Sequence, residues 1–141
     1  MKRLFAILLA MVLTSCGTSL EPPKSNTDYK NIIGRPVKID NLEIAQYDFP
    51  NILNWVDAKK ACEALGSGWR LPNIDELTVM YKNKDKIGGF KVEIYFTVNL
   101  YWSSTEYDTN HAWGADFDSY GTPDSGPNKN AKLYVRAVRS F

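Results

Sequence analysis

The chain has 141 residues, of which 44% are hydrophobic and 13% aromatic, which is enough for one domain with a substantial core. Its 17 Lys and Arg nearly balance its 16 Asp and Glu, for a net charge of +1. The sequence shows no basic cluster of the kind that a nucleic-acid partner requires, so that class of partner is excluded.

The first 15 residues have the pattern of an export signal. Two basic residues precede an uncharged apolar run over residues 4–13, which is too short for a transmembrane helix of about 20 residues. The run ends in the sequence LTSC, which resembles the lipobox of bacterial lipoproteins. We therefore predict that residues 1–15 are removed and that Cys16 carries the lipid, with acyl chains such as palmitate entering the membrane. The alternative is an ordinary secreted protein in which Cys16 is incidental.

The residues after Cys16 predict the location of the protein in the cell and the bounds of its domain. Gly17 occupies the position at which an aspartate often retains a lipoprotein at the inner membrane, so we expect the lipid-anchored chain in the cell envelope, at the outer membrane if the cell has two. Residues 16–30 are polar, contain Pro22-Pro23, and are expected to form a flexible tether. Residues 31–141 are the predicted domain. With Cys16 lipidated, Cys62 has no intrachain disulfide partner.

The first half of the domain predicts short strands and then a helix. Residues 38–49 alternate loosely between apolar and polar positions, which indicates one or two strands ending at Pro50. Asn54 followed by Asp57 is typical of a helix N-cap, and Gly66 of a helix end. The apolar face of this helix consists of Trp55, Ala58, Cys62 and Leu65.

A second helix is predicted to begin at Asn73. Glu76 follows at the capping-box position. The face of this helix consists of Ile74, Leu77, Thr78 and Tyr81, and Lys82, Lys84 and Lys86 lie near its C-terminal end, where cations suit the helix dipole.

After Gly88-Gly89 the sequence predicts strands over residues 95–98, 101–107, 112–117 and 133–139. The loop over residues 118–130 is long for a compact domain, and such loops are usually functional or disordered. Helices followed by short strands predict an α+β domain with an antiparallel sheet.

Several phrases resemble the Lcl C-terminal-like family. They are NWVDAKKACEALGSGWRLPNIDELTVMY, IGGF, YWSSTEY, AWGADF and YVRAVRS, in this order. The resemblance implies a C-type-lectin-like fold, in which two helices flank a small twisted antiparallel sheet with a loop-rich half. It also implies a non-catalytic domain with a role in adhesion to polysaccharide. The Glu-Pro-Asn, Gln-Pro-Asp and Trp-Asn-Asp motifs of calcium-dependent lectins do not occur, so we expect neither a metal nor another cofactor.

The expected structural core includes aromatic, cysteine and arginine side chains. Trp69 and Trp102 could instead line a sugar site, but large aromatic residues more often fill a small core. Arg70 could bind an anion, although an internal pair with Glu76 or Asp116 is favoured. The predicted core residues are Trp55, Cys62, Trp69, Arg70, Trp102 and Arg136.

The candidate ligand-binding residues lie in the later turn and loop: Tyr107, His111, Trp113, Asp118 and Tyr120. A lone histidine cannot form a typical zinc site, and the aspartates lack the spacing of a calcium loop. The sequence thus predicts an envelope-anchored binding module for polysaccharide or another surface protein. The alternatives are a structural subunit of an envelope assembly or an enzyme acting on envelope glycans, the latter because Asp116 and Asp118 would share one face of a strand.

Overall fold

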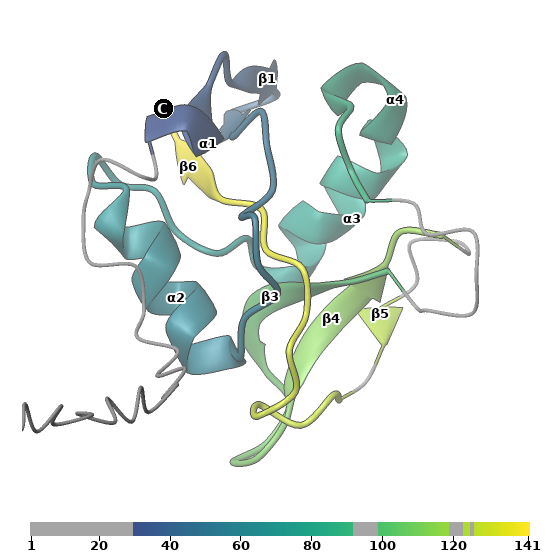
Figure 1. The fold of residues 1–141 in the computed structure, drawn as a ribbon. Helices are drawn as coiled ribbons and strands as arrows, with labels where there is room; N and C mark the ends of the chain where they lie inside the picture. The colour runs from purple at the N-terminus through teal and green to yellow at the C-terminus, as the bar shows by residue number, and fades with distance from the viewer. Residues whose placement is uncertain (1–29, 92–98, 119–122, 125) are drawn as a thin grey trace, which may run out of the picture.

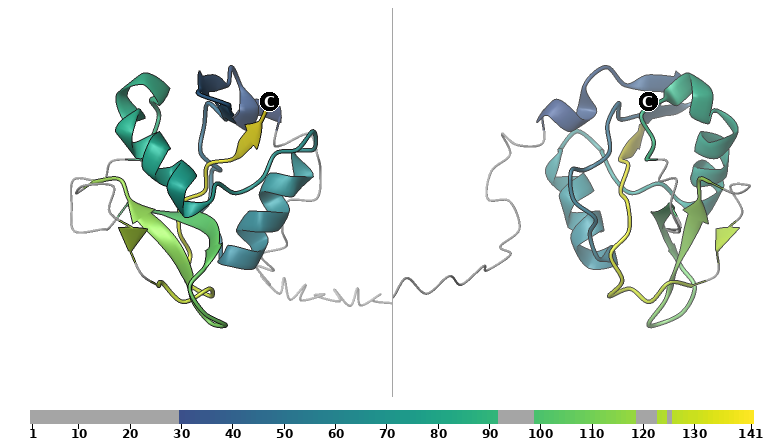
Figure 2. Two further views of the ribbon diagram at one scale, coloured as in Figure 1. Left: turned by 180° about the vertical axis from the view of Figure 1, so that it is seen from behind. Right: turned by 45° about the vertical axis from the view of Figure 1, so that its right-hand side comes forward.

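The computed structural model describes residues 30–91, 99–118, 123–124 and 126–141. Helices α2 (Trp55–Ala64) and α3 (Ile74–Lys82) lie on opposite sides of the central strands (Figures 1 and 2). This mixture of helices and antiparallel strand pairs confirms the predicted α+β class. Within these ranges, no helix has the length and apolar character needed to cross a bilayer. The predicted signal, Cys16 and almost all of the tether lie outside the described residues.

Helix α2 begins and ends at the residues predicted from its capping signals. Asn54 Oδ1 accepts a hydrogen bond from the Asp57 N–H (2.9 Å), and Gly66 adopts a left-handed φ of +72° just after the helix. Such a φ is unstrained for glycine, so the chain can leave the helix here. The buried residues of α2 are Trp55, Ala58, Ala61 and Cys62.

Helix α3 carries the predicted capping box in full. The Glu76 N–H donates to Asn73 Oδ1 (2.8 Å), and the Asn73 N–H donates to Glu76 Oε2 (2.8 Å). The helix ends at Lys82, and the next four residues form the separate helix α4 (Lys84–Ile87). Asn83 interrupts the helix because its φ of −111° departs from the helical value. Lys84 and Lys86 therefore belong to α4 and not to the end of α3.

Within the described ranges the strands form two three-stranded antiparallel sheets, where a single sheet was expected. The first has the order β1-β2-β6 and the second the order β3-β4-β5. Their strands are β1 (Val37–Ile39), β2 (Leu42–Ile44), β6 (Val138–Ser140), β3 (Leu100–Glu106), β4 (Ala112–Asp116) and β5 (Pro123–Asp124). A short helix, α1 (Lys30–Ile33), lies beside the C-terminus (Figure 1). The strand predicted over residues 95–98 lies outside the described residues.

The prediction of a strand over residues 133–139 is wrong for most of this segment, because only β6 forms a regular strand there. The preceding residues change partners as they pass between the two sheets. The Tyr134 N–H donates to the Leu100 carbonyl of the second sheet (3.0 Å), whereas the Ala137 carbonyl accepts from the Ala45 N–H next to the first (3.0 Å). No single neighbouring strand accompanies this segment, so its hydrogen bonds do not form one ladder.

Five of the six residues predicted for the core are buried. Their exposed fractions are 6% for Trp55, 0% for Cys62, 3% for Trp69, 0% for Trp102 and 0% for Arg136. Burial raises the pKa of the Cys62 thiol, which disfavours the reactive thiolate.

Arg70 does not lie in the core. Its side chain is 39% exposed and forms a bidentate pair with Glu76, in which both N···O distances are 2.7 Å. The backbone of Arg70 pairs with Val138 in an isolated bridge. The guanidinium instead lies by the surface, where Nη2 is 3.3 Å from Ser140 Oγ. Glu76 is thus the carboxylate partner, and not Asp116.

Candidate functional site

The turn between β3 and β4 forms a projecting hairpin tip. The tip lies at the opposite end of the molecule from α1 and the C-terminus, in each of the three views (Figures 1 and 2). Its backbone closes through two bonds to the His111 carbonyl, from the N–H groups of Tyr107 (3.0 Å) and Asp108 (3.1 Å). Because α1 is where the described chain begins, the tip faces away from the attachment of the predicted tether.

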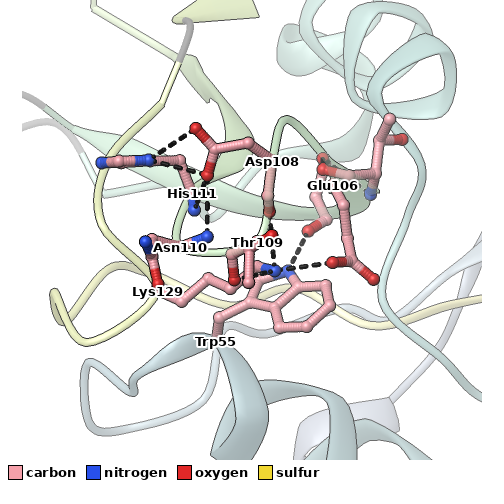
Figure 3. Close-up of polar contacts among 9 residues, drawn as sticks. Trp55, Glu106, Asp108, Thr109, Asn110, His111 and Lys129 are labelled. Atoms are coloured by element: carbon pink, nitrogen blue, oxygen red, sulfur yellow. Dashed lines mark hydrogen bonds and ion pairs between the residues drawn. The ribbon is translucent and has the colours of Figure 1, made fainter.

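Lys129 fastens the hairpin tip to α2. Its Nζ donates to Glu106 Oε2 (2.6 Å) and to the carbonyls of Asp108 and Thr109 (both 2.9 Å). The same ammonium lies 4.8 Å from the ring centroid of Trp55, the first residue of α2 (Figure 3). Hydrogen bonding from Lys129 lowers the pKa of Glu106. One largely buried cation thus satisfies two turn carbonyls and a carboxylate and holds the tip in one position.

The Asp108 carboxylate stabilises the turn by accepting hydrogen bonds from it. Asp108 Oδ1 accepts the backbone N–H groups of Asn110 (2.7 Å) and His111 (2.8 Å). The His111 ring also contacts it, with Nδ1 2.8 Å from Oδ1 and 2.9 Å from Oδ2 (Figure 3). These bonds, with that from the His111 side chain foremost, lower the pKa of Asp108, so the carboxylate is ionised at neutral pH.

Two aromatic side chains lie beside this turn. Tyr107 is 53% exposed, and its ring packs edge-on against the half-buried Trp113, with centroids 5.2 Å apart and an interplanar angle of 81°. We call Tyr107, Asp108, His111 and Trp113 the hairpin-tip surface. The surface combines apolar rings with a polar pair on a rigid support, a combination suited to binding.

Gly126 lies at the edge of the hairpin-tip surface. It has a φ of +101°, and a Cβ placed there would lie 3.5 Å from His111 Cβ and 3.7 Å from Tyr107 Cδ1. Tyr107 and His111 therefore both border Gly126. The segment that follows pairs with the turn, since the Lys129 N–H donates to the Asn110 carbonyl (2.8 Å).

The structure brings together three of the five predicted ligand-binding residues, Tyr107, His111 and Trp113. Asp118 lies beyond the opposite end of β4, where its carboxylate accepts a hydrogen bond from Asn99 Nδ2. A strand advances by about 3.3 Å per residue, so Asp118 cannot reach the tip. Including it in the same site was wrong. Tyr120 lies outside the described residues.

The residues that sequence reasoning missed are Glu106, Asp108 and Lys129. Lys129 lies 20 residues or more from the tip groups that it binds, and its neighbours carry no local signal. Asp108 had a usable signal, because an Asp three residues before a His in a predicted turn can accept turn N–H groups.

In the part of the chain that the structure describes, no three His, Cys, Asp or Glu side chains are grouped closely enough to hold a metal ion. Asp116 is the last residue of β4 and Asp118 lies in the turn after it, so the two aspartates do not share one face of a strand, and the Asp118 N–H donates to Asp116 Oδ1 (2.8 Å).

The fold belongs to the C-type-lectin-like class. The crystal structure of botrocetin is similar to it, with a TM-score of 0.53 and 8% sequence identity over 75% of this chain and 96% of that chain. The chain belongs to the Lcl C-terminal domain family, which matches residues 25–139. No curated protein matches the sequence significantly.

Proposed function

We propose that this chain is an envelope lipoprotein, held to the membrane by acyl chains on Cys16, and that its Lcl C-terminal domain is a non-catalytic module that binds polysaccharide. The observation that carries the proposal is the hairpin-tip surface. An exposed tyrosine packs edge-on against a tryptophan there, on a turn whose carbonyls at Asp108 and Thr109 are held by Lys129.

Aromatic rings suit sugar ligands because the apolar C–H face of a pyranose packs on them while its hydroxyls reach the polar rim. Tyr107 offers such a ring together with a phenolic hydroxyl, and Asp108 and His111 supply the rim. The turn is held by Lys129, so the rings are ordered before the ligand arrives and less entropy is lost on binding.

The position of the surface fits a tethered module. The tip lies at the far end of the domain from α1, so a flexible tether entering at α1 allows the surface to face away from the membrane (Figure 2). A ligand outside the bilayer can then reach the surface without passing between the domain and the membrane.

Changing Tyr107 to Ala is expected to weaken polysaccharide binding by about tenfold, since an aromatic anchor at the centre of a binding surface typically contributes about 1–2 kcal/mol. Binding is measured with a panel of purified bacterial polysaccharides on the lipidated protein in detergent. Tyr47→Ala is the matched control, because Tyr47 is 50% exposed and lies elsewhere. Equal binding by the two variants, or loss of binding in both, would contradict the assignment of this surface.

Changing Cys16 to Ser is expected to move the protein from the membrane fraction to the soluble fraction. Each buried methylene contributes about 0.8 kcal/mol, so two or three acyl chains account for stable anchoring. Immunoblotting of fractionated cells measures the shift, and Cys62→Ser, which removes a buried thiol, serves as the control that stays in the membrane. A Cys16→Ser protein that remains membrane-bound would rule out the anchor.

A further inference from the structure

We infer that the lysines around α4 dock the domain on anionic phospholipid headgroups of the membrane that holds its acyl chains, so that the hairpin-tip surface faces away from the bilayer. These lysines are Lys82, Lys84, Lys86 and Lys91, which we call the α4 lysine patch. The inference goes beyond polysaccharide binding and rests on the lipid anchor of the proposed function.

The predicted tether keeps the domain close to the bilayer but does not orient it. Thirteen residues separate Cys16 from Lys30, where the described chain begins. A chain of this length reaches at most about 45 Å when fully extended and about 20 Å on average as a flexible coil. A domain held this close meets the headgroups repeatedly, so a surface that attracts them decides which side faces the membrane.

The charge of the α4 lysine patch has one sign. Its four lysines lie within residues 82–91, in which Asp85 is the one acidic residue. Three of the lysines are exposed, and the Nζ of the fourth, Lys84, lies 4.6 Å from the ring centroid of Tyr81. Among the described residues, the ion pairs with carboxylates involve other cations. The four positive charges can therefore act on an anionic surface.

The lysines near the hairpin tip do not form a comparable patch. On α2, Lys59 and its neighbouring lysine are balanced by Asp57 and Glu63. Beside the tip, Lys129 is only 15% exposed and pairs with Glu106 (2.6 Å). This region carries charges of both signs, so the attraction of an anionic surface is weaker here than at the α4 lysine patch.

The α4 lysine patch lies at the end of the domain that the predicted tether enters. Helices α1 and α4 are at the same end in each of the three views, and the hairpin tip is at the opposite end (Figures 1 and 2). This end can rest on the bilayer while the tether stays short. Docking through α4 then places the hairpin-tip surface at the greatest distance from the headgroups.

Strands β1 and β2 lie at the same end and add to the contact (Figure 1). Glu43 is paired with Lys38 (3.3 Å) and Arg139 (2.5 Å), so its charge is compensated. Asp40 is exposed and opposes the attraction, but with a single charge. Phe141 is 61% exposed, with the Lys38 ammonium 4.2 Å from its ring centroid. An exposed aromatic ring beside a cation suits the headgroup region of a bilayer.

The expected attraction is sufficient to orient a tethered domain. Each lysine near an anionic membrane surface favours attachment by about fivefold, and the effect acts within a Debye length of about 8 Å at physiological salt. Stable membrane attachment combines acyl chains with a second signal such as a basic patch. The α4 lysine patch therefore orients the anchored protein and does not replace the anchor.

The orientation is tested with the lipidated protein in vesicles of phosphatidylcholine, with or without phosphatidylglycerol. A fluorescent donor is attached at Thr109→Cys in the exposed turn, since Cys62 is buried, and labelled headgroups are the acceptors. Energy transfer is expected to be at least about twofold weaker with phosphatidylglycerol, because the tip then points away from the bilayer. Raising the salt to about 1 M shortens the Debye length to about 3 Å and is expected to remove the difference.

A triple variant removes the exposed charges of the patch: Lys82→Gln, Lys86→Gln and Lys91→Gln. It is expected to show the same energy transfer in both kinds of vesicle. The matched control, Lys60→Gln with Lys132→Gln, changes exposed lysines elsewhere and is expected to keep the response to phosphatidylglycerol. Polysaccharide binding is expected to be unchanged in both variants.

Equal transfer in the two kinds of vesicle for the unchanged protein, stronger transfer with phosphatidylglycerol, or loss of the response in the control would overturn the inference and leave the proposed function standing. Binding of carboxymethyl-dextran that requires the α4 lysine patch, without a response to phosphatidylglycerol, would assign the patch to an anionic polymer and would also overturn it. A protein that stays with neither kind of vesicle would overturn the lipid anchor together with the inference.

Discussion

Replacing Arg136 with Met is expected to lower the free energy of unfolding by about 3–5 kcal/mol, a large part of the ~5–15 kcal/mol typical of a domain. The Arg136 guanidinium is fully buried and donates to the Asp48 carboxylate, whose side chain is 4% exposed. Without the arginine, the Asp48 charge stays buried with only the Tyr101 hydroxyl (2.6 Å) bonded to it among the described residues. Urea denaturation followed by circular dichroism measures the change.

The carbonyls bound by Arg136 add to this expected loss. Its two terminal nitrogens donate to the carbonyls of Gln46 (2.9 Å) and Gly89 (2.8 Å), and its guanidinium carbon lies 4.3 Å from the Phe90 ring centroid. One side chain therefore joins the segment after β2 to the segment after α4.

The matched control for Arg136→Met is the double variant with Asp48→Asn. An asparagine is uncharged, so the double variant should recover part of the stability lost by the single one. A double variant less stable than Arg136→Met, or a single variant within about 1 kcal/mol of the unchanged protein, would show that the buried pair does not determine stability.

Replacing Trp102 with Ala is expected to cost about 3–5 kcal/mol through the cavity and lost apolar contact. The side chain is 0% exposed and packs in the cluster that includes Trp69 and Cys62. Its Nε1 also donates to the Leu53 carbonyl (2.8 Å), which would lose this partner. Thermal and urea denaturation measure the loss.

The control for Trp102→Ala is Trp113→Ala, which removes the same type of side chain from a half-buried position on the neighbouring strand. We expect a clearly smaller loss of stability, together with weaker polysaccharide binding. The assignment of Trp102 to the core would fail if its alanine variant were as stable as the unchanged protein and lost only binding.

Local signals were sufficient for the helices and for much of the core. The caps of α2 and α3 depend on bonds between residues three positions apart, so Asn54-Asp57 and Asn73-Glu76 could be recognised directly. The helical spacing of apolar residues likewise placed Trp55 and Cys62 on the inner face of α2. The family phrases supplied the C-type-lectin-like class, which spacing alone does not specify.

What the sequence alone determined is therefore the α+β class, the two capped helices and the inner face of α2, because each depends on the spacing of residues a few positions apart. Only the tertiary structure decided that Lys129 fastens the hairpin tip, that Arg136 pairs with Asp48 at a separation of 88 residues, and that Asp118 lies apart from the site. These contacts depend on where distant segments meet after folding. The residues next to a side chain in the sequence do not indicate which distant residue will contact it in the folded protein.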